Sequence, residues 1–208
     1  MIGLYAIARG APREAMGARG ERVRVVARGE LEAVCGDPSP PLSEDALRAH
    51  EAAVRRIADA SSACLPARFG SCATDEAALS AALAARETEL AEALALVAGR
   101  EQMTLRVHGD AVDEPSNAGP GTRYLEARRR SRTMPELGPL RAALSALIRA
   151  ERIERHTESG LLASVYHLID RGSAPAYRQA VESTRLEGMH VTFSGPWPAW
   201  SFAPELAP

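Results

Sequence analysis

The stretch that decides the fold of this chain is Leu161–Phe193, which reads LLASVYHLIDRGSAPAYRQAVESTRLEGMHVTF. Its first ten residues are apolar on both faces, which indicates a strand that is buried on both sides. Residues 173–187 have the spacing of an amphipathic helix, and residues 189–193 return to a strand pattern. A strand, a helix and a second strand in this order usually support parallel strands, so the stretch predicts a mixed α/β fold.

Further strands are expected upstream of this stretch. Residues 2–8 and 22–28 have strand patterns on either side of a loop that contains Gly, Arg and Pro, and residues 102–108 are also strand-like. A short apolar piece at 31–35 is followed at 36–41 by a run of Gly, Asp, Pro and Ser that breaks regular structure. Strands are therefore expected in both halves of the chain.

Helices are expected at three further places. Ser43 followed by two acidic residues is a good helix start, because its hydroxyl can cap the first turn and acids favour the positive end of the helix dipole. A longer helix is predicted over 74–98, where leucines recur at three-, four- and seven-residue steps. Pro135 opens the third helix, whose leucines and Ile148 are expected to face inward.

The domain boundary is expected between these helices. Residues 109–121 are rich in Asp, Pro and Gly, a composition that suits a solvated connector. We therefore predict two domains, 1–113 and 118–208. A short and very basic helical stretch at 124–132 follows the connector, and its arginines are typical of a solvated face that pairs with acids elsewhere.

Composition and charge limit the class of protein. Of 208 residues, 46% are hydrophobic but only 4% are aromatic, so aliphatic cores are expected. All 25 basic residues are arginines, yet the net charge is -2, which lacks the basic footprint that nucleic-acid binding requires. The sequence has neither a signal-peptide pattern nor an apolar run long enough to cross a bilayer. A cytoplasmic protein with no membrane span and no nucleic-acid partner is expected.

Motifs that carry chemistry are sparse. The sequence has no phosphate-binding loop, no HExxH and no GxSxG. The five histidines share no metal-ligand spacing, and Cys35, Cys64 and Cys72 lack the close pairing of zinc or redox sites. We therefore expect no catalytic residue, no metal site and no cofactor, and we interpret the cysteines as small buried hydrophobic residues. His50 lies on the apolar stripe of its helix and is interpreted as a half-buried structural residue.

Two short segments are more distinctive. Leu65-Pro66-Ala67-Arg68-Phe69-Gly70 fixes the chain path with a proline and a glycine, and it can aim its arginine at a carboxylate. Gly195-Pro196-Trp197-Pro198-Ala199-Trp200-Ser201-Phe202 holds both tryptophans and one of three phenylalanines. This second segment is either a terminal strap whose rings cover an apolar face or a binding surface, where Trp is enriched. The candidate residues for partner binding or for a structural motif are Leu65, Pro66, Arg68, Phe69, Gly70, Gly195, Pro196, Trp197, Pro198, Trp200 and Phe202.

These segments also carry a family resemblance. Together with the opening Ile2-Gly3-Leu4-Tyr5-Ala6-Ile7, and with Tyr124-Leu125 before basic residues, they occur in the order expected for gas vesicle proteins of the GvpF/GvpL family, which this chain resembles over nearly its whole length. The resemblance implies an N-terminal ferredoxin-like domain and a smaller, helix-rich α+β C-terminal domain that ends in an aromatic strap. It also implies a non-catalytic cytoplasmic accessory protein that binds the major gas vesicle shell protein, with other gas vesicle accessory proteins as further partners, and assists nucleation or assembly.

Two other classes of function remain open from the sequence. A ferredoxin-like scaffold hosts many functions, so a ligand-binding or regulatory module is the main alternative. A small enzyme that uses a cysteine with a histidine would require an exposed thiol of low pKa.

Overall fold

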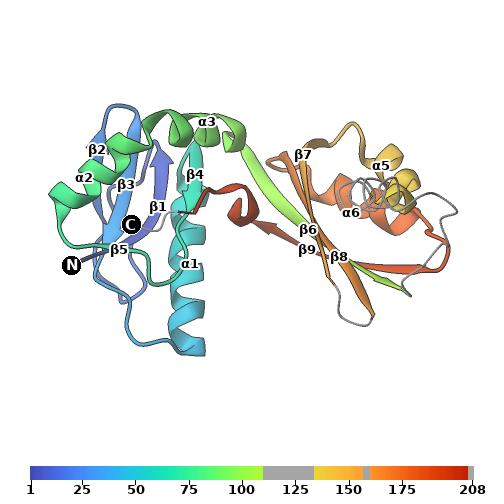
Figure 1. The fold of residues 1–208 in the computed structure, drawn as a ribbon, viewed down its shortest axis with the longest axis horizontal. Helices are drawn as coiled ribbons and strands as arrows, with labels where there is room; N and C mark the ends of the chain where they lie inside the picture. The colour runs from blue at the N-terminus through green and yellow to red at the C-terminus, as the bar shows by residue number, and fades with distance from the viewer. Residues whose placement is uncertain (110–133, 157–159, 206–208) are drawn as a thin grey trace, which may run out of the picture. The chain divides into compact units, whose positions relative to one another are not determined.

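The structure is a computed structural model that describes residues 1–109, 134–156 and 160–205 (Figure 1). The chain divides into two compact units. Unit 1 comprises Met1–Glu101 together with Trp197–Pro208, and unit 2 comprises Gln102–Pro196. Each unit has a sheet and helices of its own, which confirms the predicted mixed α+β class. The basic stretch 124–132, and the predicted connector beyond Gly109, lie outside the described residues.

The sheet of unit 1 is built around the start of the chain. Its order is β2-β3-β1-β4, with β5 also paired to β1, and all of these pairings are antiparallel. The strands are β1 (Ile2–Arg9), β2 (Arg24–Arg28), β3 (Leu31–Gly36), β4 (Ala63–Pro66) and β5 (Cys72–Ala73). The expected strands at 2–8 and 22–28 are confirmed, and the apolar piece at 31–35 forms β3. The strands β4 and β5 are too short for an alternating pattern to show in the sequence.

Three helices complete the main elements of unit 1: α1 (Glu44–Ala60), α2 (Glu76–Ala85) and α3 (Glu87–Val97). The predicted start of α1 is confirmed, because Ser43 Oγ accepts a hydrogen bond from the Ala46 N–H at 3.2 Å. The prediction of one helix over 74–98 is wrong, since the backbone leaves helical geometry at Arg86, with φ −124° and ψ 19°. The Arg86 guanidinium then binds Glu89 in the first turn of α3, which stabilises the new start.

Unit 2 has a four-stranded sheet in the order β7-β8-β6-β9. Its elements are β6 (Arg100–Gly109), η1 (Pro135–Leu137), α5 (Gly138–Leu144), β7 (Ile148–Arg155), β8 (Leu161–Asp170), α6 (Ala174–Ser183) and β9 (Met189–Trp197). The strand, helix and strand predicted over Leu161–Phe193 are confirmed as β8, α6 and β9. Because β6 lies between β8 and β9, they form a split β-α-β unit.

The strand β7 is absent from the sequence-based prediction. The helix expected to run from Pro135 to Ile148 ends at Leu144, and Ile148 begins a strand that pairs antiparallel with β8. Five of the eight β7 residues are charged, and β7 lies at an edge of the sheet. Its extended conformation therefore depends on pairing with β8, which the local pattern does not show.

Both sheets place their four main strands in one order. Counted along the chain within each unit, the order across the sheet is fourth, first, third, second, as in βαββαβ ferredoxin-like folds. In unit 1, residues 10–23 connect β1 to β2 without a helix. The N-terminal unit thus has the expected strand order but lacks the first helix of that fold.

The two units divide at points that differ from the predicted domains 1–113 and 118–208. Unit 2 begins at Gln102, within β6, because β6 is a central strand of its sheet. The chain after Pro196 belongs to unit 1, where η2 (Trp200–Phe202) contacts β4. The aromatic C-terminal segment is therefore a part of the N-terminal unit.

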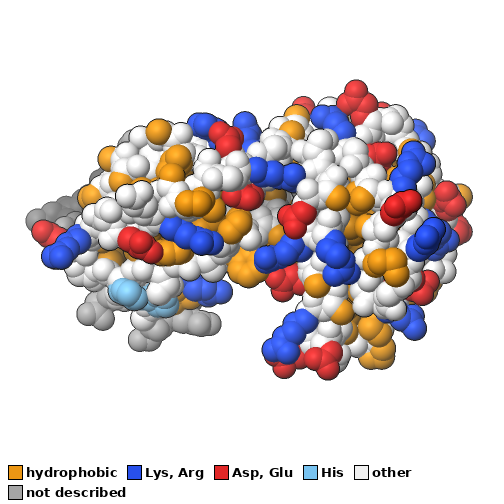
Figure 2. Space-filling view, turned by 180° about the vertical axis from the view of Figure 1, so that it is seen from behind, with side chains coloured by type: hydrophobic (Ala, Val, Ile, Leu, Met, Phe, Trp, Pro, Cys, Tyr) orange, Lys and Arg blue, Asp and Glu red, His pale blue; other side chains and the backbone are white. Residues whose placement is uncertain are grey.

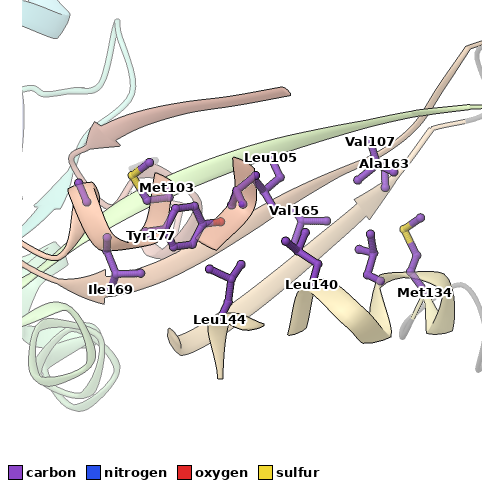
Figure 3. Packing of buried hydrophobic residues seen from close by; sticks show 13 residues of the cluster. Met103, Leu105, Val107, Met134, Leu140, Leu144, Ala163, Val165, Ile169 and Tyr177 are labelled. Carbon is purple, nitrogen blue, oxygen red and sulfur yellow. The ribbon is translucent and has the colours of Figure 1, made fainter. Parts of the chain in front are cut away.

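The core of unit 2 lies between its sheet and the helices α5 and α6 (Figure 3). Met103 and Leu105 of β6 belong to the same buried cluster as Leu144 of α5 and Tyr177 of α6. Aliphatic side chains dominate this cluster, as the composition predicted. In unit 1 a second buried cluster joins β1 to α1 through residues such as Ala6 and Ile57.

The surface carries charges of both signs. On the face seen in Figure 2, arginine side chains are interspersed with aspartate and glutamate side chains. Several form ion pairs, such as Arg9 with Glu30 at 2.9 Å and Arg149 with Asp170 at 2.6 Å. Exposed pairs of this kind contribute little to stability, so the two cores carry most of it. Among the helices that the structure describes, none has the length and apolar character needed to span a membrane.

Candidate functional site

The centre of the candidate site is a buried histidine on α1. His50 is 4% exposed, and its Nε2 lies 2.9 Å from the carbonyl oxygen of Ala67, to which it donates a hydrogen bond. This bond attaches the middle of α1 to the Leu65–Gly70 segment. It also fixes the proton of a neutral imidazole on Nε2. The prediction of a structural helix histidine is confirmed, with deeper burial than expected.

Three aromatic rings surround His50. The ring centroids of Tyr5, Phe69 and Trp200 lie 5.5, 5.6 and 6.4 Å from that of His50, and Phe69 meets it edge-on at 82°. We call these four residues the aromatic cluster. Phe69 comes from the first distinctive segment and Trp200 from the second, so the structure brings the two segments together in unit 1.

The predicted site residues separate by exposure. Leu65, Pro66, Pro198 and Phe202 are buried, and they position the backbone of the two segments. Those that reach the surface in unit 1 are Arg68, Phe69, Gly70, Trp197 and Trp200. Gly195 and Pro196 belong to unit 2, where the Gly195 carbonyl accepts a hydrogen bond from Arg178 at 2.6 Å. The structure therefore does not place these two with the others.

Charged side chains hold the C-terminal segment on unit 1. Arg68 pairs with Glu205 at 2.9 Å, and the Glu205 carbonyl accepts a hydrogen bond from Arg86. The guanidinium carbon of Arg55 lies 4.8 Å from the centroid of the Trp197 ring, within cation–π range. Both side chains of the Arg68–Glu205 pair are more than 70% exposed, so this pair adds at most about 1 kcal/mol. The packing of rings and prolines holds the segment more strongly.

Tyr5 links the aromatic cluster to the loop between β1 and β2. Its hydroxyl donates to Glu21 Oε1 at 2.5 Å and accepts from the Ala18 N–H at 2.8 Å. Burial, together with the Glu21 hydrogen bond, raises the pKa of Tyr5 to about 12, so the phenol stays protonated and keeps donating. Burial opposes the charge of Glu21, but hydrogen bonds from Tyr5 and from backbone N–H groups outweigh it and lower the Glu21 pKa.

The site offers contact surface and little reactive chemistry. Cys35 and Cys64 are buried and Cys72 is half-buried. Burial raises the pKa of the Cys35 thiol to about 11, which keeps it in the poorly nucleophilic thiol form. Within residues 1–109, 134–156 and 160–205, His, Cys, Asp and Glu form no group of three or more that could hold a metal ion.

Comparison with known proteins identifies the family. Residues 2–204 match the family described as gas vesicle synthesis protein GvpL/GvpF. The chain belongs to this family. No protein among the curated sequences matches it. Both distinctive segments and the aromatic cluster lie within the matched range.

Two solved GvpF structures are similar to this GvpL/GvpF chain. The crystal structure of GvpF from Anabaena sp. PCC7120 matches with a TM-score of 0.74 and 17% identity, over 98% of this chain and 95% of that one. GvpF from Microcystis aeruginosa matches with a TM-score of 0.75 and 16% identity, over 98% of both chains. At such low identity the match establishes a shared fold.

Sequence reasoning missed three contributors to the site of this GvpL/GvpF member. Tyr5 reads as an ordinary strand residue, the Ala67 carbonyl has no sequence signal, and Glu205 lies 137 positions beyond its partner Arg68. The sequence does contain one signal for the site, because His50 is a polar residue on an otherwise apolar helix stripe. A buried imidazole needs a hydrogen-bond partner, so His50 indicates that a partner exists but does not identify the Ala67 carbonyl.

The buried histidine makes the stability of this family member depend on pH. Burial lowers the pKa of His50, and the hydrogen bond to Ala67 only partly opposes this. The unfolded chain therefore takes up a proton first, at its ordinary pKa of about 6.5. The stability that neutral His50 contributes is complete above that value and is lost as pH falls toward the folded pKa, by at most about 1.4 kcal/mol per pH unit. Urea unfolding at pH 7.5 and 5.5 measures this loss.

The variant His50→Gln should be less stable at pH 7.5 and should lose less stability between the two pH values, because its amide does not titrate. His190→Gln makes the same change at an exposed position and serves as the control. An unchanged difference between the two pH values in His50→Gln would show that His50 is not the titrating group.

Proposed function

We propose that this chain is a non-catalytic accessory protein of gas vesicle formation. It acts in the cytoplasm, binds the major gas vesicle shell protein and assists nucleation or assembly of the shell. Family membership supports the role in gas vesicles. The observation that carries the binding step is the group of partly exposed aromatic rings on unit 1.

The arrangement of these rings suits partner binding. Phe69, Trp197 and Trp200 are all half-buried, so each has a fixed base and an exposed edge. Aromatic side chains of this kind supply large contact area at a low cost in conformational entropy, and Trp is enriched at binding hot spots. Arg55 and Arg68 lie next to them and add polar contacts at the rim. The surface thus combines an aromatic centre with a charged margin.

An unassembled shell protein would offer apolar area for such a surface to cover. A protein that forms a gas-filled shell must present apolar area on its inner side, and that area is exposed to water before assembly. Exposed apolar area promotes aggregation of unassembled subunits. A partner that covers it with aromatic rings would keep subunits available for ordered growth.

The test is binding of purified shell protein to the full chain and to surface variants. Trp197→Ala should weaken binding about tenfold or more, because truncation of a hot-spot tryptophan costs roughly 2 kcal/mol. Phe69→Ala should also weaken binding to the shell protein. Isothermal calorimetry or a quantitative pull-down gives the affinities, and circular dichroism checks that the variants fold.

Tyr166→Ala is the matched control, since Tyr166 is a half-buried aromatic residue of unit 2. It should leave the affinity for the shell protein unchanged. If the intact chain fails to bind shell protein, the proposed function is lost. If Trp197→Ala and Phe69→Ala bind as tightly as the original chain, the function stands and the assigned surface is wrong.

A second candidate function is a ligand-binding or regulatory module. Unit 1 holds a pocket of about 250 Å³ between α2, α3 and β1, with an almost entirely apolar lining. Its lining includes Leu4, Ile7, Cys72, Ala78, Leu83 and Leu90. A small molecule that copurifies with the chain, or a rise in melting temperature with an added metabolite, would favour this function.

A further inference from the structure

The pocket of unit 1 lies where the helices α2 and α3 separate. The chain bends between them at Arg86, and α2 packs mainly on β2 whereas α3 packs mainly on β4. β2 and β4 are the opposite ends of the strand order β2-β3-β1-β4. The part of β1 between the two helices therefore forms the floor of a pocket of about 250 Å³.

The floor of this pocket depends on an irregularity in β1. Side chains of a regular strand alternate between the two faces of the sheet, which would place Leu4 and Ile7 on opposite faces. The register of β1 against β3 shifts between Leu4 and Ala6, and both Leu4 and Ile7 line the pocket. Tyr5 and Ala6 instead belong to the buried cluster that includes α1. Bulges are frequent next to functional sites, where they redirect a side chain in this way.

The walls of the pocket are aliphatic. Leu79 and Leu83 of α2 and Leu90 of α3 line it, and each of them is at most 5% exposed. Ala78 and Ala82 of α2 also line it, but at exposed positions. Because these two side chains are small and reach the surface, they form the mouth of the pocket.

The guanidinium group in the lining, that of Arg86, is already paired. Its Nε and Nη2 donate to the two carboxylate oxygens of Glu89 at 2.8 and 2.9 Å, and Nη1 donates to the Glu205 carbonyl. The hydrogen bonds from Arg86 lower the pKa of Glu89, so this carboxylate stays charged and balances the guanidinium. Met1 also lines the pocket, but it is 73% exposed, so solvent screens its α-amino charge. Among the described residues that line the pocket, none therefore offers a buried, unpaired charge to an ionic ligand.

Volume and lining together indicate the class of ligand. An engineered apolar cavity of about 150 Å³ binds benzene, so a pocket of about 250 Å³ is large enough for roughly ten non-hydrogen atoms. A carboxylate among these leucines would lose its hydration without gaining a cation, which opposes binding. Cys72 and Thr74 contribute a thiol and a hydroxyl at half-buried and exposed positions, so a single hydroxyl group of a ligand fits at that margin.

We propose that this pocket binds a small, uncharged, apolar molecule of roughly ten non-hydrogen atoms, such as a medium-chain alcohol. The proposal rests on the ligand-binding module given above as the second candidate function, and it specifies the ligand class. It is separate from shell-protein binding, because the rings assigned to that step, Phe69, Trp197 and Trp200, do not line the pocket.

The first test compares 1-octanol with octanoate, which has the same number of carbons but a negative charge at pH 7.5. Isothermal calorimetry with the full chain should give a dissociation constant on the order of 0.1 mM for 1-octanol, as expected for a ligand of about nine non-hydrogen atoms. Octanoate should bind at least about tenfold more weakly, because its charge must be desolvated. Octanoate that binds as tightly as 1-octanol would overturn the assigned ligand class.

The second test locates the binding of 1-octanol. Ala82→Leu narrows the mouth of the pocket and should raise the dissociation constant about tenfold or more. Ala78→Leu, one helical turn earlier on the same face, should have the same effect. Ala81→Leu is the matched control, because Ala81 is an exposed residue of α2 that does not line the pocket, and it should leave the affinity unchanged. Circular dichroism checks that the variants fold.

Three results would contradict the proposal. If 1-octanol binds equally well to Ala82→Leu, Ala78→Leu and the original chain, it binds outside the pocket. If it fails to bind at millimolar concentration and Ala82→Leu instead weakens binding of shell protein, the pocket accepts a side chain of that partner. If a copurified or added charged metabolite binds whereas 1-octanol does not, the ligand-binding function stands and the ligand class is wrong.

Discussion

Gly3→Ala should destabilise unit 1 by about 2–3 kcal/mol. A Cβ atom at Gly3 would lie 2.3 Å from the backbone carbonyl oxygen of Asp37 and 3.2 Å from the Cα of Pro38. These are backbone atoms of the segment directly after β3, so no side chain can rotate away, and the backbone itself must shift. Forced shifts in a packed interior typically cost 1–3 kcal/mol, and about that cost is expected here. Urea unfolding followed by tryptophan fluorescence measures it, since both tryptophans lie in unit 1.

The position of Gly3 in the sheet raises the free-energy cost of this backbone shift. It lies opposite Gly36 on β3 and opposite Cys72 on β5, so β1 is held from both sides at this residue. Gly17 also has close neighbours, but all of them are atoms of the Glu21 carboxylate, the end of a side chain, whereas a Cβ at Gly36 would in addition lie 2.6 Å from a ring carbon of the buried Tyr5. Alanine at Gly17 should therefore cost less than at Gly3.

Gly138→Ala is the control for this substitution, and because Gly138 lies in unit 2, which has no tryptophan, its effect is followed by hydrogen exchange of α5 peptides. A Cβ at Gly138 meets nothing within 4 Å, and the residue lies at the start of α5. Alanine there should be neutral or stabilising by up to about 1 kcal/mol, because it has the higher helix propensity. An unfolding midpoint for Gly3→Ala that equals that of the original chain would mean that the ends of β1 and β3 adjust freely.

Local patterns in the sequence predicted most of the fold. The serine cap at Ser43 and the alternation in β2 depend on residues close together in sequence, and such signals can be read directly. The break in the helix at Arg86 could not be predicted from the sequence pattern, because the leucine spacing continues across it from α2 into α3. The strand β7 could not be predicted either, because its sequence IRAERIER has the charges of a solvated helix. This segment forms a strand only because it pairs with β8.

The candidate site, too, could be predicted only in part, because its contacts join residues far apart in the sequence. Composition alone marked the C-terminal segment, because both tryptophans of an aromatic-poor chain lie in it. The contact of Trp200 with His50 joins residues 150 positions apart, and a single sequence carries no signal for such a pair. The fold brings the two segments together, because Phe69 and Trp200 both lie next to the His50 ring.

Tyr177→Ala should destabilise unit 2 by about 3–5 kcal/mol. Tyr177 is fully buried among Leu105, Leu144 and Ile169 (Figure 3), so its removal leaves a large cavity. It also removes a hydrogen bond, because the Tyr177 hydroxyl lies 2.6 Å from Nδ1 of His167. Hydrogen exchange of β8 and α6 peptides is the suitable measurement, since unit 2 contains no tryptophan.

The buried hydrogen bond belongs to a longer network. His167 Nε2 lies 3.0 Å from Glu151, which also binds Arg141 at 3.0 Å. Burial, with the charge of Glu151, raises the pKa of Tyr177 far above its ordinary value, so the phenol keeps its proton and donates it to Nδ1. His167 must then donate from Nε2 to Glu151. The network thus ties α5, β7, β8 and α6 together through donors and acceptors of fixed direction.

Tyr177→Phe separates packing from hydrogen bonding. It keeps the ring and removes only the hydroxyl, which leaves Nδ1 of the buried His167 without its donor, so it should cost about 1–3 kcal/mol. Tyr166→Phe is the control, because the Tyr166 hydroxyl binds Glu154 at the surface, and it should change stability by less than about 0.5 kcal/mol. Equal losses for Tyr177→Phe and Tyr166→Phe would mean that the network adds nothing beyond packing. Equal losses for Tyr177→Phe and Tyr177→Ala would instead mean that the hydrogen bond, and not the ring, carries the stabilisation.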